Sequence, residues 1–135
     1  MIIDVEPFIA PWDSGQDALD QGIASFLAGV AAIETVAVVF FATNSARVPS
    51  ALPATAGIKV EYLVSARKPL RTAPYRGLPV PGLVIGDQVA TDGILAKRIG
   101  YTFLHYRPEP SSMPPGPRIL FGCGTIIRPV LFRPR

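Results

Sequence analysis

Cysteine and histidine are almost missing from this 135-residue chain, which contains one of each, Cys123 and His105. One cysteine cannot form an internal disulfide bond. One cysteine and one histidine also cannot supply the nitrogen and sulfur ligands of a zinc cage. Any metal ion in this protein would therefore be held by oxygen atoms, and neither residue is assigned a catalytic role.

Long apolar runs are absent too, although 49% of the residues are hydrophobic. Charged residues interrupt each apolar run before it reaches the roughly 20 residues that a membrane-spanning helix needs. The N-terminal residues include Asp4 and Glu6 and lack the basic start and long apolar stretch of a signal peptide. We therefore expect a cytoplasmic protein, and the chain has the length of one domain.

Positive and negative charges are unevenly distributed along the chain, whose formal net charge is +3. Acidic residues are concentrated before position 21, whereas arginines accumulate after position 67. This asymmetry suits an anionic partner, and it is equally compatible with a role in solubility alone.

Short apolar segments alternate with helical segments along the chain. The expected strands are residues 1–5, 35–41, 60–64, 82–86 and 101–106, and the expected helices are residues 14–31, capped by Ser14, and 91–99, stopped by Gly100, with a short turn at 50–56. The second strand is β-branched and aromatic, which is typical of a central strand covered on both faces. The alternation favours a parallel α/β fold over a β-sandwich.

The last part of the chain has a different character. Residues 108–117 are rich in proline and have almost no helical capacity, and the apolar pieces that follow surround Gly122, Cys123 and Gly124. We therefore divide the chain into an α/β domain at residues 1–107 and a basic, apolar extension at 108–135 that packs on the same domain.

Polar side chains follow four of the expected strands. Asp4, Thr43, Lys68 and Asp87 each come at or just after a strand end. In an open parallel sheet, ligands bind outside the carboxyl ends of the strands, so these four groups should converge on one edge. Two carboxylates suit Mg²⁺, and a hydroxyl and an ammonium suit a phosphate group. Asp4 could attack phosphorus directly, which would lead to phosphomonoester hydrolysis.

Four motifs in the same order resemble those of the haloacid dehalogenase (HAD) superfamily, and more closely its class III phosphatases of the YqeG and mitochondrial phosphatidylglycerophosphatase type. The motifs are residues 4–13 (DVEPFIAPWD), 41–45 (FATNS), 66–70 (ARKPL) and 86–94 (GDQVATDGI). The match extends from residue 2 to about 106, and the Lys-Pro pair together with the last motif is its most specific part.

The resemblance implies a three-layer, Rossmann-like (HAD-like) domain with a mainly parallel sheet, Mg²⁺ as cofactor and hydrolysis through an aspartyl phosphate. The compact chain leaves little room for a large cap. The roles that the resemblance implies are nucleophile for Asp4, acid and base for Glu6, charge stabiliser for Lys68, phosphate binders Thr43, Asn44 and Lys68, and metal ligands Asp4, Glu6, Asp87 and Asp92.

Two positions depart from the family's first motif. Glu6 stands where the family has a second aspartate, and Phe8 stands where it has a threonine. Because a displacement near 1 Å can reduce a rate by about 10²-fold, the added methylene of Glu6 bears directly on turnover. Two hypotheses follow: a Mg²⁺-dependent phosphatase, or a catalytically impaired HAD-like domain that binds a phosphorylated ligand or a protein partner.

The expected ligand is a phosphorylated small molecule or a lipid head group. The basic C-terminal tail is compatible with a peripheral membrane contact, and equally with an ordinary packed extension or an oligomer contact. A contact between this tail and nucleic acid is the weakest of the alternatives.

Overall fold

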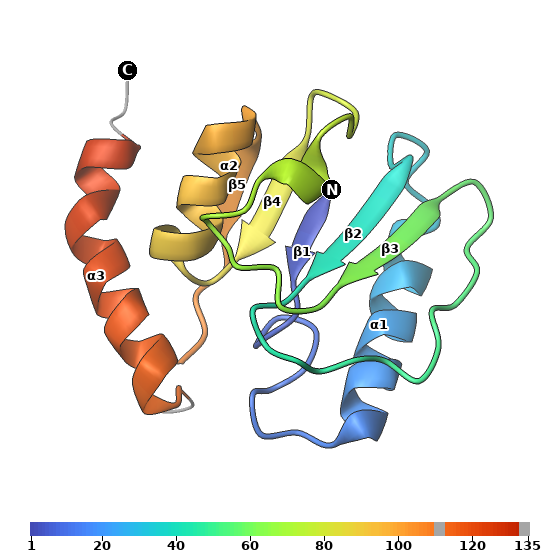
Figure 1. The fold of residues 1–135 in the computed structure, drawn as a ribbon. Coiled ribbons are helices and arrows are strands. Elements are labelled where there is room, and N and C mark those ends of the chain that lie inside the picture. Colours follow the sequence, from blue (N-terminus) through green and yellow to red (C-terminus); the bar gives the residue numbers. More distant parts are fainter. Residues whose placement is uncertain (110–112, 133–135) are drawn as a thin grey trace.

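The computed structural model describes residues 1–109 and 113–132. Its sheet contains β1 (Ile2–Asp4), β2 (Val38–Ala42), β3 (Lys59–Leu63), β4 (Leu83–Gly86) and β5 (Thr102–His105), in the spatial order β3-β2-β1-β4-β5. Every neighbouring pair is parallel. The fold is therefore α/β and Rossmann-like, as the alternation of segments predicts (Figure 1).

The helices are α1 (Gln16–Val30), α2 (Ile94–Ile99) and α3 (Pro115–Leu131), with a 3₁₀ turn η1 (Ala73–Tyr75) and a π-helical turn η2 (Val89–Gly93). None of the helices in the described ranges is long and apolar enough to cross a membrane.

Each face of the sheet has its own apolar core, because successive side chains of a strand point to opposite faces. Ile3, Phe41 and Ile85 pack with Ile23 and Leu27 of α1 on one face. The other face carries a second cluster, which consists of Ile2, Phe40, Ala42 and Val84 together with Ala66, Tyr75, Leu95 and Ala96. β2 thus contributes to both cores, which confirms that it is a central strand covered on both faces.

Helix α1 begins later than the sequence predicts. Its N-cap residue is Gly15, which makes no side-chain cap, and Ser14 instead donates a hydrogen bond from Oγ to the Pro11 carbonyl at 2.8 Å. The prediction that Ser14 caps this helix is wrong, because its hydroxyl is used by the preceding loop. The short helical turn expected at residues 50–56 is also absent from the described structure, where the only regular feature is an isolated bridge between Thr55 and Ile58. Pro49 and Pro53 account for this difference, since proline fixes φ and removes a backbone donor.

The strand edges and the helix stop near Gly100 follow the sequence more closely. Gly100 ends α2 with φ of 75°, a left-handed conformation that favours glycine. β2 is the exception among the strands, because it starts at Val38 rather than at Thr35.

Helix α3 was not expected, since residues 108–117 have almost no helical capacity and two glycines follow. The prolines at its start lie in the first turn. Backbone N–H groups there have no acceptor within the helix, so proline loses no helical hydrogen bond. α3 packs along η2 at the β5 end of the sheet (Figure 1). Gly124 faces Val89, and Phe132 stacks on Phe103 at 5.7 Å. Tertiary packing of one helix face therefore outweighs poor intrinsic propensity.

Two glycines of α1 give a test of this packing. A Cβ atom at Gly22 would lie 2.1 Å from the Ile9 carbonyl oxygen, whereas one at Gly29 would meet nothing within 4 Å. We expect Gly22→Ala to lower the free energy of unfolding by roughly 1–3 kcal/mol through overpacking. Gly29→Ala, the matched control, should raise it by about 0.5–1 kcal/mol through helix propensity. Urea unfolding followed by circular dichroism measures both, and equal effects of the two substitutions would contradict the close contact.

Candidate functional site

The site lies where the chain changes direction across the sheet. From β1 the chain builds β2 and β3 on one side, and then returns to place β4 and β5 on the other side. Ligand crevices form at such a switch point, outside the carboxyl ends of the strands. Asp4 ends β1 and Asp87 directly follows β4, so their carboxylates flank this point.

Lys68 is buried between two carboxylates. Its Nζ atom lies 2.6 Å from Asp4 Oδ1 and 2.7 Å from Asp92 Oδ1, and its side chain is 1% exposed. Burial alone would lower the pKa of Lys68, but the attraction of the two carboxylates outweighs it and raises the pKa above its ordinary value. Burial, and then the charge of Asp92, raise the pKa of Asp4, while Lys68 opposes them. The lysine therefore stays charged between the two acids.

Gly86 explains how Asp92 comes so close to the strand ends. A Cβ atom at Gly86 would lie 2.4 Å from the Cγ of Asp92, so only glycine leaves room for this carboxylate beside β4. The wide turn of η2 carries Asp92 to this position, and its backbone N–H donates to the Gln88 carbonyl at 2.8 Å. The glycine of the Gly-Asp-Gln motif thus has a steric role in the site.

Asp87 is a buried carboxylate without a partner. It is 0% exposed, and neither of its side-chain oxygens has a hydrogen-bond partner among the described residues. Burial, and then the charge of Asp92, raise the pKa of Asp87 to about 7. Such an orphaned group is costly unless something satisfies it.

Three carboxylates could share one cation. Asp4, Asp87 and Asp92 each offer an oxygen atom, and these atoms lie within 4.8 Å of one another. Hard divalent cations such as Mg²⁺ prefer such oxygen donors. The two oxygens of Asp87 are donors that no described residue uses in a hydrogen bond, so the residues present fit a metal ion.

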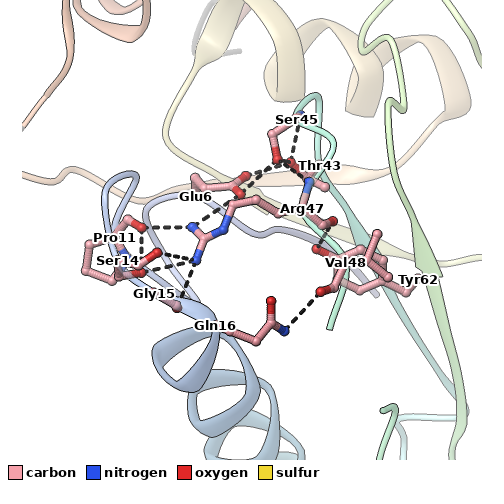
Figure 2. Close-up of polar contacts among 10 residues, drawn as sticks. All are labelled: Glu6, Pro11, Ser14, Gly15, Gln16, Thr43, Ser45, Arg47, Val48 and Tyr62. Atoms are coloured by element: carbon pink, nitrogen blue, oxygen red, sulfur yellow. Dashed lines mark hydrogen bonds and ion pairs between the residues drawn. The ribbon is translucent and has the colours of Figure 1, made fainter. Parts of the chain in front are cut away.

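Glu6, which we expected among the metal ligands, lies outside this group. Its carboxylate accepts hydrogen bonds from Thr43 Oγ1 at 2.6 Å and from Ser45 Oγ at 3.1 Å, and lies 3.6 Å from Arg47 Nη1 (Figure 2). The hydroxyl of Thr43, expected to bind phosphate, is therefore engaged by an acidic side chain.

Arg47 holds the Glu6 carboxylate and the loop before α1 together. Its guanidinium donates to the carbonyl oxygens of Pro11 at 2.9 Å and Ser14 at 3.0 Å, and the Tyr62 hydroxyl donates to the backbone carbonyl of Arg47 (Figure 2). We call the contact of Glu6 with Thr43, Ser45 and Arg47 the Glu6 latch. Neither Arg47 nor Ser45 was singled out from the sequence, because their role depends on contacts with residues more than thirty positions away.

Asn44 supports Lys68 rather than facing the site with its amide. Its side-chain oxygen accepts from the backbone N–H of Lys68 at 2.8 Å, and its amide donates to the Lys68 carbonyl at 3.2 Å. This reciprocal pair fixes the backbone of Lys68 and so orients its ammonium group toward Asp4.

Phe8, the second departure from the family motif, does not fill the site. Its ring meets Phe26 of α1 at 5.9 Å and Tyr106 at 5.1 Å, both in edge-to-face geometry, and it packs against the core under α1. The site instead opens into a cavity of about 230 Å³ lined by polar groups of Asp4, Glu6 and Arg47. Trp12 and Leu120, the latter from α3, form its apolar walls.

Comparisons with protein-family models, with curated proteins and with solved structures found no match to this chain. The interpretation of the site therefore depends on the residues and on their geometry alone.

Removing the buried lysine charge should be costly. We expect Lys68→Met to lower the free energy of unfolding by about 3–5 kcal/mol, because Asp4 and Asp92 would be left buried without a counter-charge. Lys59→Met is the matched control, since Lys59 is 70% exposed in its ion pair with Glu61 and should change stability by less than about 1 kcal/mol. Urea unfolding at pH 8 measures both, and a small effect at Lys68 would contradict the strength of this contact.

Asp87 gives a test of the metal site. In EDTA, we expect Asp87→Asn to unfold at a higher temperature than the wild type, because the substitution removes a buried, unpaired charge. Added Mg²⁺ should stabilise the wild type by about 2.7 kcal/mol at 100 times its Kd, and should leave Asp87→Asn unchanged. Asp17→Asn, an exposed position on α1, is the control that should behave as wild type. If added Mg²⁺ leaves the unfolding temperature of the wild type unchanged, the metal site is ruled out.

Proposed function

We propose that the chain is an HAD-like, Mg²⁺-dependent phosphatase that hydrolyses a phosphomonoester through an aspartyl phosphate on Asp4. The observation that carries this proposal is the placement of Asp4 at the switch point, where it forms an ion pair with Lys68. Carboxylate oxygens of Asp4, Asp87 and Asp92 lie within 4.8 Å of one another there. The order of the four motifs along an all-parallel sheet supports the assignment to the superfamily.

Asp4, Asp87 and Asp92 are the residues that would hold the cation. When bound, Mg²⁺ supplies positive charge that offsets the three carboxylates and the phosphate oxygens. Lys68 adds a fixed ammonium on the same side, where it favours the negative charge that develops during phosphoryl transfer.

The reaction that these residues support has two displacements. A carboxylate oxygen of Asp4 attacks phosphorus, a P–O bond forms, and the bond from phosphorus to the ester oxygen breaks. The leaving alcohol takes up a proton. Water then attacks the acyl phosphate and gives a proton to the Glu6 carboxylate, and inorganic phosphate leaves while the Asp4 carboxylate is restored. Lys68 holds Oδ1 of Asp4, which leaves Oδ2 outside this ion pair.

The proton for the leaving alcohol is assigned to Glu6, and this step requires the Glu6 latch to open. In the latched arrangement Glu6 accepts from Thr43 and Ser45 and faces the Arg47 guanidinium, so its carboxylate does not donate. Opening the latch would also free the Thr43 hydroxyl for a phosphate oxygen. Substrate binding therefore has to compete with an internal carboxylate.

The same latch favours a second candidate function. A domain whose Glu6 stays locked would still hold a cation and a phosphorylated ligand beside Asp4 and Lys68, but would not turn it over. The 230 Å³ cavity fits a small phosphorylated molecule or a lipid head group in either case.

Phosphate release from a broad phosphomonoester panel tests the proposal. We expect turnover that EDTA abolishes and that Asp4→Asn lowers by about 10³-fold or more, because the nucleophile is lost. Glu6→Gln should lower kcat by about 10²-fold, because a general acid is lost. Asp13→Asn, an exposed carboxylate in the same loop, is the control and should keep wild-type activity.

The outcomes separate the two candidate functions. Activity that survives Asp4→Asn would exclude the aspartyl-phosphate route. No turnover, combined with Mg²⁺ binding that requires Asp87, would exclude the phosphatase and favour the locked, ligand-binding domain. Glu6→Asp, which restores the family's residue, should then show whether the added methylene is what prevents catalysis.

A further inference from the structure

A hollow of about 220 Å³ lies between α3 and the end of β5. Three parts of the chain line it, and they supply Phe121 and Arg128 from α3, Val89 from η2, and His105 and Arg107 from the end of β5 and the residues after it. We call this space the arginine hollow. It shares no lining residue with the cavity beside Asp4, so the two are separate sites.

Two arginines from distant parts of the chain face this hollow without a partner. The guanidinium groups of Arg107 and Arg128 make no hydrogen bond or ion pair with any residue in the part of the chain that the structure describes. Burial lowers the pKa of His105, and the charges of Arg107 and Arg128 lower it further. Both guanidinium groups therefore lie within electrostatic range of the same imidazole ring.

The rest of the lining does not neutralise these two charges. Asp87 is acidic, but it is 0% exposed and its carboxylate belongs to the acidic cluster with Asp4 and Asp92. His105 directs Nε2 to the backbone carbonyl of Asp87 at 2.9 Å, and its Nδ1 atom is buried with no hydrogen-bond partner among the described residues. A hollow lined by charges of one sign focuses their field and attracts a counter-ion. The arginine hollow is thus suited to an anion.

The number of charges identifies the chemistry of that anion. A guanidinium group is a rigid fork of N–H donors that matches the oxygens of a carboxylate or a phosphate. One carboxylate would offset only one of the two arginines. A phosphate dianion offsets both, and it has enough oxygen atoms to accept hydrogen bonds from two guanidinium groups at once.

We propose that the arginine hollow binds one phosphate dianion between Arg107 and Arg128, as inorganic phosphate or as the phosphate group of a small soluble monoester. The apolar side chains of Val89 and Phe121 lower the local dielectric constant, which strengthens the attraction. Because the two arginines come from α3 and from the residues after β5, the bound anion would join these parts of the fold. The proposal is independent of the proposed phosphatase function, which uses none of the residues named in this paragraph.

His105 allows a direct test, because it is the single histidine of the chain and it lines the hollow. The proton NMR signals of its ring are followed on the full chain at pH 8, where the imidazole is neutral. Inorganic phosphate, glycerol phosphate or acetate is added at constant ionic strength. EDTA is present, so that the acidic cluster holds no cation and its carboxylates disfavour phosphate there.

We expect both phosphate compounds to shift the His105 signals in a saturable way, and acetate to bind at least about tenfold more weakly because it carries one charge. Equal affinities for the two phosphate compounds would show that the phosphate group alone is recognised. Tighter binding of glycerol phosphate would identify a monoester as the ligand.

Arginine variants test which side chains hold the anion. Arg107→Gln and Arg128→Gln should each weaken phosphate binding by at least about tenfold, because charge-assisted hydrogen bonds are lost. Arg128→Lys keeps the charge without the fork and should fall between Arg128→Gln and the wild type. Arg71→Gln is the matched control, since it removes the same charge from an exposed position between β3 and η1 and should bind as wild type. Circular dichroism checks that each variant is folded.

Three results would overturn the proposal. The first is a set of His105 signals that phosphate does not shift. The second is acetate binding as tightly as phosphate, because the hollow would then not select a dianion. The third is an equal loss of binding in Arg71→Gln and Arg107→Gln, which would mean that the net charge of the chain, rather than this hollow, attracts the anion.

Discussion

The ammonium group of Lys68 lies buried between the carboxylates of Asp4 and Asp92, and the arrangement of the site depends on this contact. One positive charge faces three buried acids, since Asp87 lies in the same cluster. Burying that excess of negative charge costs stability, and the two oxygens of Asp87, which have no hydrogen-bond partner in the described part of the chain, add to the cost. A stable fold tolerates such a cluster where it serves function, and a divalent cation is the group that would offset it.

The second constraint is the competition between Glu6 and a phosphate group for the same donors. Thr43, Ser45 and Arg47 provide two hydroxyls and a guanidinium, which are the groups that recognise a phosphate, and the Glu6 carboxylate now uses them (Figure 2). The latch therefore imitates the charge of a ligand. Its strength decides between a phosphatase and a binding domain, because both use the same cation and the same lysine.

Helix α3 joins these features to the surface of the molecule. It supplies one wall of the cavity beside Asp4, and its other side exposes Ile119 and Ile126. A proline-containing segment with little intrinsic helicity is helical here because η2 provides a surface for it to pack on (Figure 1). The same helix thus shapes the pocket and exposes apolar side chains to solvent.

The sequence by itself determined the α/β class, the approximate positions of the strands and the location of Asp4, Thr43, Lys68 and Asp87 at their ends. These features depend on local hydrophobic periodicity and on the rule that parallel strands end on one edge. Only the tertiary structure decided that Glu6 faces Thr43 rather than the metal cluster, that Ser14 does not cap α1 and that residues 115–131 form a helix. The physical reason is that each of these outcomes depends on a partner distant along the chain or on competition for a single hydrogen bond, and neither leaves a periodic pattern in the sequence.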